Sequence, residues 1–117
     1  QDDCVELFLS PTRDNNYYQI VVNSIGTVFD VRVENGNLNG DRSWNARMQH
    51  AVHVEPTSWS LEMELPLDQF GVPAPQPGAV WAANLARIRI ANASEYGQWS
   101  PTNGSALRPD RFGLLVF

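Results

Sequence analysis

The stretch QDDCVELFL, residues 1–9, predicts a β-strand over residues 4–9, because apolar residues dominate it and they do not recur at the 3.6-residue period of a helix. Successive side chains of a strand point to opposite faces. The two faces are Val5, Leu7 and Leu9 on one side and Cys4, Glu6 and Phe8 on the other. A carboxylate among apolar neighbours needs a salt bridge, a metal ion or a polar ligand. Glu6 is therefore the first candidate functional residue.

The same kind of pattern recurs along the chain and predicts an all-β, antiparallel, jelly-roll-like β-sandwich with little helix. Loops rich in Gly, Pro, Asn and Asp separate the apolar runs. One helical turn is expected at 67–71, and a β-bulge near Ala86 would correct an irregular alternation in the strand that contains it. Strands are expected at 4–9, 17–23, 27–33, 47–54, 59–65, 79–90 and 111–117.

Length and composition limit the possible classes of protein. The 117 residues suffice for a single domain with its own core, predicted to span residues 1–117. The net charge of −5 argues against nucleic-acid binding, which needs a basic surface. One cysteine excludes an internal disulfide, and no apolar run approaches the ~20 residues that span a membrane. All eight basic residues are arginine, whose planar group suits bidentate contacts.

An ordered set of segments resembles the family 9 carbohydrate-binding modules and their relatives. The set covers nearly the whole chain: DDCVELFL (2–9), YYQIVVN (17–23), GTVFD (26–30), WSLEMELPLDQFG (59–71), PGAVWAANLAR (77–87), WSPT (99–102) and DRFGLLVF (110–117). The resemblance implies a β-sandwich that binds a polysaccharide or oligosaccharide, often carries structural calcium, and is attached to a secreted glycoside hydrolase. It further implies an extracellular or periplasmic location.

Two features depart from the family pattern. Members have several strands before the segment that corresponds to residues 2–9, so this domain is expected to lack the family's first strands. Their two sugar-clamping tryptophans have no counterpart here, since one position lies upstream of Gln1 and the other falls near residues 106–107. The predicted function is a non-catalytic module that targets a polysaccharide-degrading enzyme to its substrate. The alternative is an assembly domain that has lost sugar binding and contacts another protein.

Glu6 and Arg87 are the charged candidates for sugar binding. By the resemblance, Glu6 accepts hydrogen bonds from sugar hydroxyls, and a carboxylate can accept from two adjacent hydroxyls through charge-assisted bonds. The alternative for Glu6 is a buried salt bridge to Arg87 or Arg89 of a neighbouring strand.

Gln19, Asn23 and Trp44 complete the predicted sugar-binding set. Gln19 and Asn23 share a strand face, and their amides both donate and accept hydrogen bonds; a solvated strand face is the alternative. Trp44 follows a polar loop and could stack on a sugar ring, or it could serve in packing. The other tryptophans, Trp59, Trp81 and Trp99, are expected to be structural.

Two loops rich in asparagine and aspartate predict a structural calcium site, since calcium prefers carboxylate and amide oxygens. The family precedent favours the ion, and ordinary turn formation is the alternative. The predicted ligands are Asp14, Asn16, Asn37 and Asp41.

No catalytic site is predicted. Glu62 and Glu64 are paired on one strand face, but nothing nearby would raise the pKa of one of them to make a general acid. Cys4 lies in an apolar strand and is expected to be inert. The chain also lacks a G-x-S-x-G nucleophile motif.

The apolar segment 4–9 also predicts an assembly. If the strands that precede it in the family are missing, its edge is unpaired, and an unpaired apolar edge promotes association. The expected result is a homodimer or a larger assembly, with N-terminal residues or the partner edge at the interface.

Overall fold

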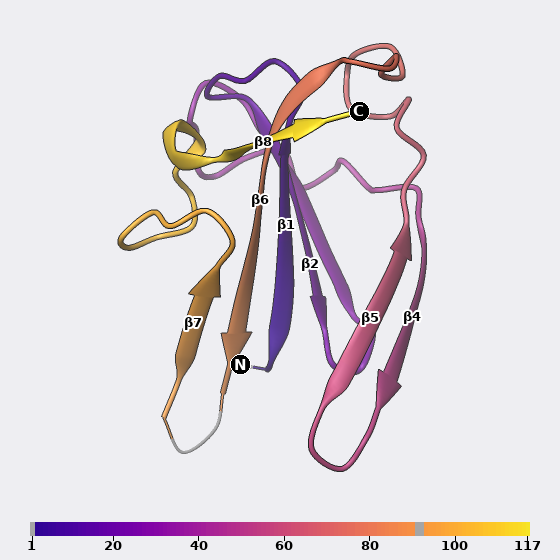
Figure 1. The fold of residues 1–117 in the computed structure, drawn as a ribbon, viewed down its shortest axis with the longest axis vertical. Helices are drawn as coiled ribbons and strands as arrows, with labels where there is room; N and C mark the ends of the chain where they lie inside the picture. Colours follow the sequence, from indigo (N-terminus) through magenta and orange to yellow (C-terminus); the bar gives the residue numbers. More distant parts are fainter. Residues whose placement is uncertain (1, 91–92) are drawn as a thin grey trace.

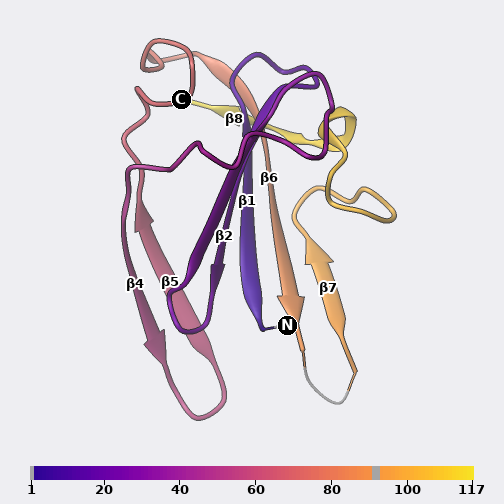
Figure 2. The ribbon, with the colours of Figure 1, turned by 180° about the vertical axis from the view of Figure 1, so that it is seen from behind.

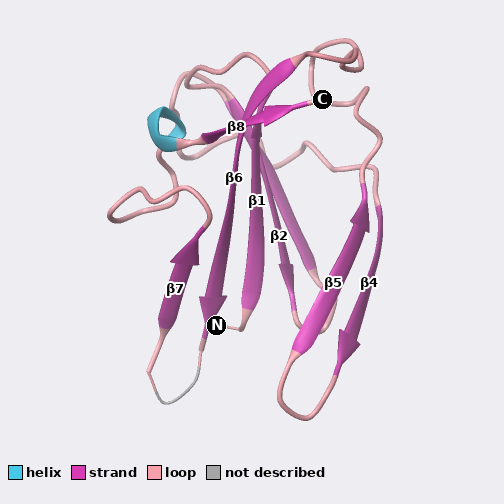
Figure 3. Cartoon of the chain, in the orientation of Figure 1, coloured by secondary structure: helices cyan, strands magenta, loops and turns pink. Residues whose placement is uncertain are grey.

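The computed structural model describes residues 2–90 and 93–117, which form antiparallel strands joined by loops (Figure 1, Figure 3). No helix in these two ranges is long and apolar enough to cross a membrane. The elements are β1 (Cys4–Ser10), β2 (Tyr17–Asn23), β3 (Val28–Val33), β4 (Gln49–Val54), β5 (Trp59–Glu64), β6 (Val80–Arg89), β7 (Glu95–Gln98), the 3-10 turn η1 (Pro109–Arg111) and β8 (Gly113–Val116).

The strands form two sheets, which confirms the predicted β-sandwich. The larger sheet has the order β3-β2-β1-β6-β7, and β8 pairs with the first residues of β6. The hairpin β4–β5 is the smaller sheet and stands beside the larger one in both views (Figure 1, Figure 2). All seven predicted strands are present, but β7 and η1 were not predicted. The expected helical turn at 67–71 is wrong, because only a non-helical turn lies there.

Strand register determines which residues share a face of the larger sheet. Pairing of β1 with β6 runs without interruption from Cys4↔Ile88 to Ser10↔Ala82, so the predicted bulge near Ala86 is absent. No bulge is needed, because Arg87 and Arg89 form ion pairs with Glu95 of β7 and so can share a face with apolar residues. We call the two faces the Glu6 face and the Leu7 face.

Each face has its own buried cluster. On the Glu6 face, Phe8 and Tyr17 are almost fully buried with Val31 and Val33, and the segment before β8 covers them through Phe112. The cluster on the Leu7 face contains Leu9, Tyr18, Phe70, Trp81 and Ala83, with Trp44, Leu65 and Phe117 packed against it. The hairpin also lies on this side, since Trp59 and Leu61 of β5 share a small cavity with Val5 of β1.

β1 lies inside the larger sheet, paired with β2 along one edge and β6 along the other. The expected unpaired edge at residues 4–9 is therefore wrong, and the reason given for a homodimer fails with it. The outer strands of this sheet are β3 at one side and β7 with β8 at the other. Oligomeric state itself stays a prediction.

Asn84 closes the gap between β7 and β8, which share one edge of β6. Its side chain is fully buried. The amide nitrogen donates to the Ser100 carbonyl oxygen at 3.0 Å, and the amide oxygen accepts from the Ser100 N–H at 2.8 Å and the Leu85 N–H at 2.9 Å. One side chain thus takes the place of a strand partner and fixes the start of the loop that follows β7.

Replacement Asn84→Ala should lower the free energy of unfolding by about 1–3 kcal/mol, because it leaves buried backbone groups without hydrogen-bond partners. Chemical denaturation measures the change. Asn39→Ala, which removes an exposed loop amide, is the matched control and should have little effect. Equal losses in the two variants would show that Asn84 is not a structural bridge.

Candidate functional site

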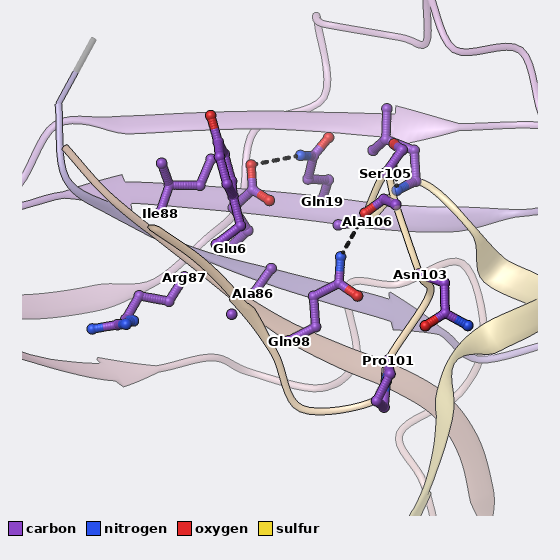
Figure 4. Close-up of a pocket in the computed structure, with 14 residues that line it drawn as sticks. Glu6, Gln19, Ala86, Arg87, Ile88, Gln98, Pro101, Asn103, Ser105 and Ala106 are labelled. Atoms are coloured by element: carbon purple, nitrogen blue, oxygen red, sulfur yellow. Dashed lines mark hydrogen bonds between the residues drawn. The ribbon is translucent and has the colours of Figure 1, made fainter. Parts of the chain in front are cut away.

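A groove of about 820 Å³ lies on the Glu6 face, between the larger sheet and the loop after β7 (Figure 4). Its volume falls within the roughly 300–1,000 Å³ typical of small-molecule sites. The lining side chains from the sheet are Glu6, Gln19, Ala86, Ile88, Tyr96 and Gln98, with Arg87 at the rim and Pro101 and residues 103–107 from the loop.

A row of directly paired residues crosses the sheet, and Gln98, Ala86 and Glu6 of this row lie in the floor of the groove. Gln98, Ala86 and Glu6 are paired in sequence from β7 to β6 to β1, and the row continues through Val21 to Phe29 on β3. Neighbouring strands lie about 4.8 Å apart. Because Ala86 carries only a methyl group, space remains above it between Gln98 and Glu6.

Glu6 lies half-buried in this floor. Gln19 Nε2 donates to Glu6 Oε1 at 3.5 Å, a long hydrogen bond (Figure 4). Burial raises the pKa of the Glu6 carboxyl, and the Gln19 hydrogen bond offsets part of that rise. The alternative salt bridge is wrong: Arg87 and Arg89 lie on the Leu7 face, where both pair with Glu95, at 3.2 and 2.8 Å.

Tyr96 places an exposed aromatic ring in the same groove as Glu6. It is paired with Ile88 and therefore lies on the Glu6 face, where 69% of its surface is exposed. Phe29, at the far end of the row, is 42% exposed, with the Arg42 guanidinium 5.5 Å from its ring centre. Tyr96 was missed from the sequence because β7 was missed.

The wall of the groove is a loop organised by Gln98. Its amide oxygen accepts from the Thr102 N–H at 2.8 Å, and its amide nitrogen donates to the Gly104 carbonyl oxygen at 3.0 Å. The buried Thr102 hydroxyl lies 2.8 Å from both Gln98 Oε1 and the Ser105 carbonyl oxygen. Since Gln98 is engaged in this way, Glu6 and Gln19 are the polar side chains of β1 and β2 that line the groove and keep hydrogen-bonding capacity for a ligand.

The predicted sugar-binding residues do not all meet at the groove. Glu6 and Gln19 are adjacent, whereas Arg87 is directed away from Gln19 (Figure 4). Asn23 is on the Glu6 face but holds the β2–β3 turn, where its amide oxygen accepts from the N–H groups of Ile25 and Thr27 at 3.2 and 2.8 Å. The structure thus gives Asn23 a local role.

Trp44 lies away from Glu6, in the cluster on the Leu7 face. Its ring centre is 4.8 Å from that of Tyr18 and 6.0 Å from that of Phe70, which matches the packing alternative. Trp81 is buried as expected. Trp99 was also expected to be structural: its ring lies against Gly113 of β8, which has no side chain to displace it, although 58% of the Trp99 surface is exposed.

The first predicted calcium loop uses its oxygens in turn formation. Asp14 Oδ1 accepts from the Thr12 hydroxyl at 2.7 Å and from the Asn16 N–H at 2.9 Å. These bonds, the Thr12 bond first, lower the pKa of the Asp14 carboxyl. Asn16 Oδ1 accepts from the Asn35 N–H at 2.9 Å, which ties this loop to the second one.

The second predicted calcium loop also uses its side-chain oxygens to accept hydrogen bonds within the loop. Asn37 Oδ1 accepts from the Asn39 N–H at 3.2 Å, and Asp41 Oδ1 accepts from the Ser43 N–H at 2.9 Å. Hydrogen bonds from Ser43 are the main reason that the pKa of Asp41 is lowered, and Arg32 lies 3.6 Å from its other oxygen. In the described part of the chain, no three His, Cys, Asp or Glu side chains are grouped to hold a metal ion.

Calcium binding stays a prediction with a direct test. If the two touching loops hold the ion, adding calcium to metal-stripped protein should raise the melting temperature. At a calcium concentration of one hundred times the Kd, the free energy of unfolding should rise by about 2.7 kcal/mol. Differential scanning calorimetry with calcium, magnesium and a chelator measures the shift. No shift with calcium would contradict the prediction.

Comparison with known proteins shows a shared fold. One solved structure, described as a "putative carbohydrate-binding protein" from Bacteroides uniformis ATCC 8492, superimposes with a TM-score of 0.73 at 22% sequence identity. The match covers 97% of this chain and 60% of the other, so the chain spans less than two thirds of that protein. No protein-family model matches, and no curated protein matches. The likeness shows the β-sandwich fold and does not single out the family 9 modules.

Proposed function

We propose that this domain is a non-catalytic carbohydrate-binding module and that its sugar site is the groove on the Glu6 face. One observation carries the proposal: a half-buried carboxylate, an amide and an exposed aromatic ring, those of Glu6, Gln19 and Tyr96, line one groove of suitable size. A fold shared with a protein described as carbohydrate-binding supports it.

These three side chains suit the chemistry of a sugar. A pyranose ring has an apolar C–H face that stacks on an aromatic ring and an edge of hydroxyl groups. Glu6 can accept hydrogen bonds from two adjacent hydroxyls, while Gln19 can donate to one and accept from another. A glycosidase needs two carboxylates across the sugar. Among the described residues that line the groove, Glu6 is the one carboxylate, which supports binding without hydrolysis.

The wider role rests on the sequence resemblance. We place the domain among relatives of the family 9 modules, as an extracellular or periplasmic accessory that directs a polysaccharide-degrading enzyme to its substrate. The ligand is then a polysaccharide or oligosaccharide.

Calorimetric titration with a panel of soluble oligosaccharides tests the proposal. At least one should bind, and Tyr96→Ala should weaken that binding by about 1 kcal/mol, roughly fivefold, through loss of ring stacking. Tyr96→Phe keeps the ring and should bind nearly as well as the wild type. Failure of every sugar in the panel to bind would overturn the proposed function.

A second candidate, an assembly domain, is favoured by an apolar patch on the Leu7 face. Leu85, Trp99 and Leu115 are 45%, 58% and 36% exposed there. The Trp99 N–H donates to the Leu85 carbonyl oxygen at 2.8 Å, so these two residues are neighbours. Light scattering at micromolar concentration separates the candidates: a homodimer that dissociates in Trp99→Ser, with no sugar binding, would support assembly.

A further inference from the structure

The charges around the groove are unevenly distributed. Glu6 is the one acidic residue in its described lining, and Arg87 is the one basic residue. The Arg87 guanidinium is bound to Glu95, 3.2 Å away on the Leu7 side. The Glu6 carboxylate therefore faces the groove without a cationic partner among the described residues.

Further negative charge lies at the N-terminal end of β1, where Asp2 and Asp3 precede Cys4. The Cys4 side chain shares the Glu6 face, one row below Glu6. Burial chiefly raises the pKa of the Cys4 thiol, and the negative charges of Glu6, Asp3 and Asp2 raise it further. Glu6 and the two N-terminal aspartates therefore place negative charge at the start of β1, next to the groove that Glu6 lines.

Glu6 is also poorly supplied with hydrogen bonds. An ionised carboxylate has about four acceptor positions, and one described donor, Gln19, reaches it at 3.5 Å. A neutral sugar that covers the groove would remove water from Glu6. Its hydroxyl groups would replace the lost hydrogen bonds, but they would not neutralise the charge of the carboxylate. An ammonium group returns both hydrogen bonds and charge, so it compensates better for the lost hydration.

Tyr96 adds a second feature suited to a cation. Its exposed ring lines the same groove as Glu6, and the face of an aromatic ring attracts ammonium groups. The negative charge of Glu6 acts against a ligand with carboxylate or sulfate groups, because like charges brought together in a partly buried site repel each other.

We propose that the groove selects sugars that carry a free, protonated amino group over neutral and acidic sugars. This inference rests on the proposed function of the same groove. Glu6 pairs with the ammonium nitrogen, Tyr96 contacts the ring or the ammonium group, and Gln19 bonds a neighbouring hydroxyl. N-acetylation of the sugar removes the charge and should remove the preference.

Calorimetric titration with matched oligosaccharides of glucosamine, N-acetylglucosamine, glucose and glucuronic acid tests the selection. The buffer has low salt and a pH at which the amine and Glu6 are both ionised. The glucosamine oligomer should bind at least roughly tenfold more tightly than the glucose and N-acetylglucosamine oligomers. The glucuronic acid oligomer should bind most weakly.

Two charge-matched variants show whether the preference comes from the groove. Glu6→Gln should bind the glucosamine and glucose oligomers with similar affinity. Glu62→Gln removes the same charge from the exposed face of β5, so it should keep the preference. If Glu6→Gln keeps it, the amine binds through the net charge of the protein, and the inference is overturned.

The outcomes distinguish this inference from the function on which it rests. Equal or tighter binding of the neutral or acidic oligomers by the wild type overturns the amine selection and leaves sugar binding intact. If no oligomer binds, and none of the wider panel does, the proposed function itself fails.

Discussion

Glu6→Gln should weaken the binding of the preferred sugar by about 1.5–3 kcal/mol, which is roughly a 10- to 150-fold rise in Kd. The variant keeps the shape of the side chain but loses the charged acceptor. Glu6 lies at the centre of the groove floor and has one weak internal partner, so its remaining acceptor positions are open to a ligand. Calorimetric titration of the wild type and the variant gives the difference directly.

The same variant should not destabilise the domain. Because burial raises the pKa of Glu6 in the folded state, the folded protein holds this proton more tightly than the unfolded chain does. Stability linked to Glu6 is therefore greatest below the unfolded-state pKa and is lost as the pH rises through the folded-state pKa. At neutral pH the glutamine variant should be at least as stable as the wild type. Weaker binding accompanied by a lower melting temperature would instead make Glu6 a structural residue.

Phe70→Ala should lower the free energy of unfolding by about 3–5 kcal/mol, the range found when a large buried aromatic side chain is removed. Phe70 is 1% exposed. Its ring packs edge-on against Tyr18 at 5.2 Å and Trp81 at 5.8 Å between ring centres. Since Phe70 lies in the connection that follows β5, its loss also loosens the attachment of the β4–β5 hairpin to the larger sheet.

Urea denaturation measures this loss, with Phe29→Ala as the matched control. Phe29 is 42% exposed on β3, so its removal creates no closed cavity and should cost far less. Similar losses in the two variants would contradict the central packing role of Phe70.

Much of the fold could be predicted because the strands are long and alternate regularly. In β5, the partly buried Leu61 and Met63 alternate with the exposed Ser60, Glu62 and Glu64, as the sequence pattern predicts for a hairpin with one solvent-exposed face. β7 could not be found in the same way. It has four residues, one of them Gly97, so it carries too few alternations to stand out from a loop.

Pairing of distant segments is the part of the fold that local patterns do not contain. The predicted bulge at Ala86 assumed that Arg87 and Arg89 could not share a face with Trp81. The structure keeps them on that face because Glu95, on the undetected β7, pairs with both arginines. The predicted open edge of β1 was wrong for a related reason, since its partners on both sides come later in the chain.

Only part of the candidate site could be predicted, because local patterns reveal single unusual residues but not which distant strands pair. Glu6 stood out as a charge in an apolar strand, and Gln19 lies next to it in the structure. Asn23 and Trp44 were chosen by residue type and by resemblance, but register places the first at a turn and packing places the second on the Leu7 face. Tyr96 belonged to a strand without a detectable pattern.

Mapping of amide chemical shifts by NMR during titration with a bound oligosaccharide tests the central claim, that the sugar site is the groove on the Glu6 face. The shifts should be largest at Glu6, Gln19, Tyr96 and Gln98, and small along the β4–β5 hairpin. Shifts centred on Trp44 or Trp99, on the Leu7 face, would contradict the claim and place the sugar site on the opposite side of the sheet.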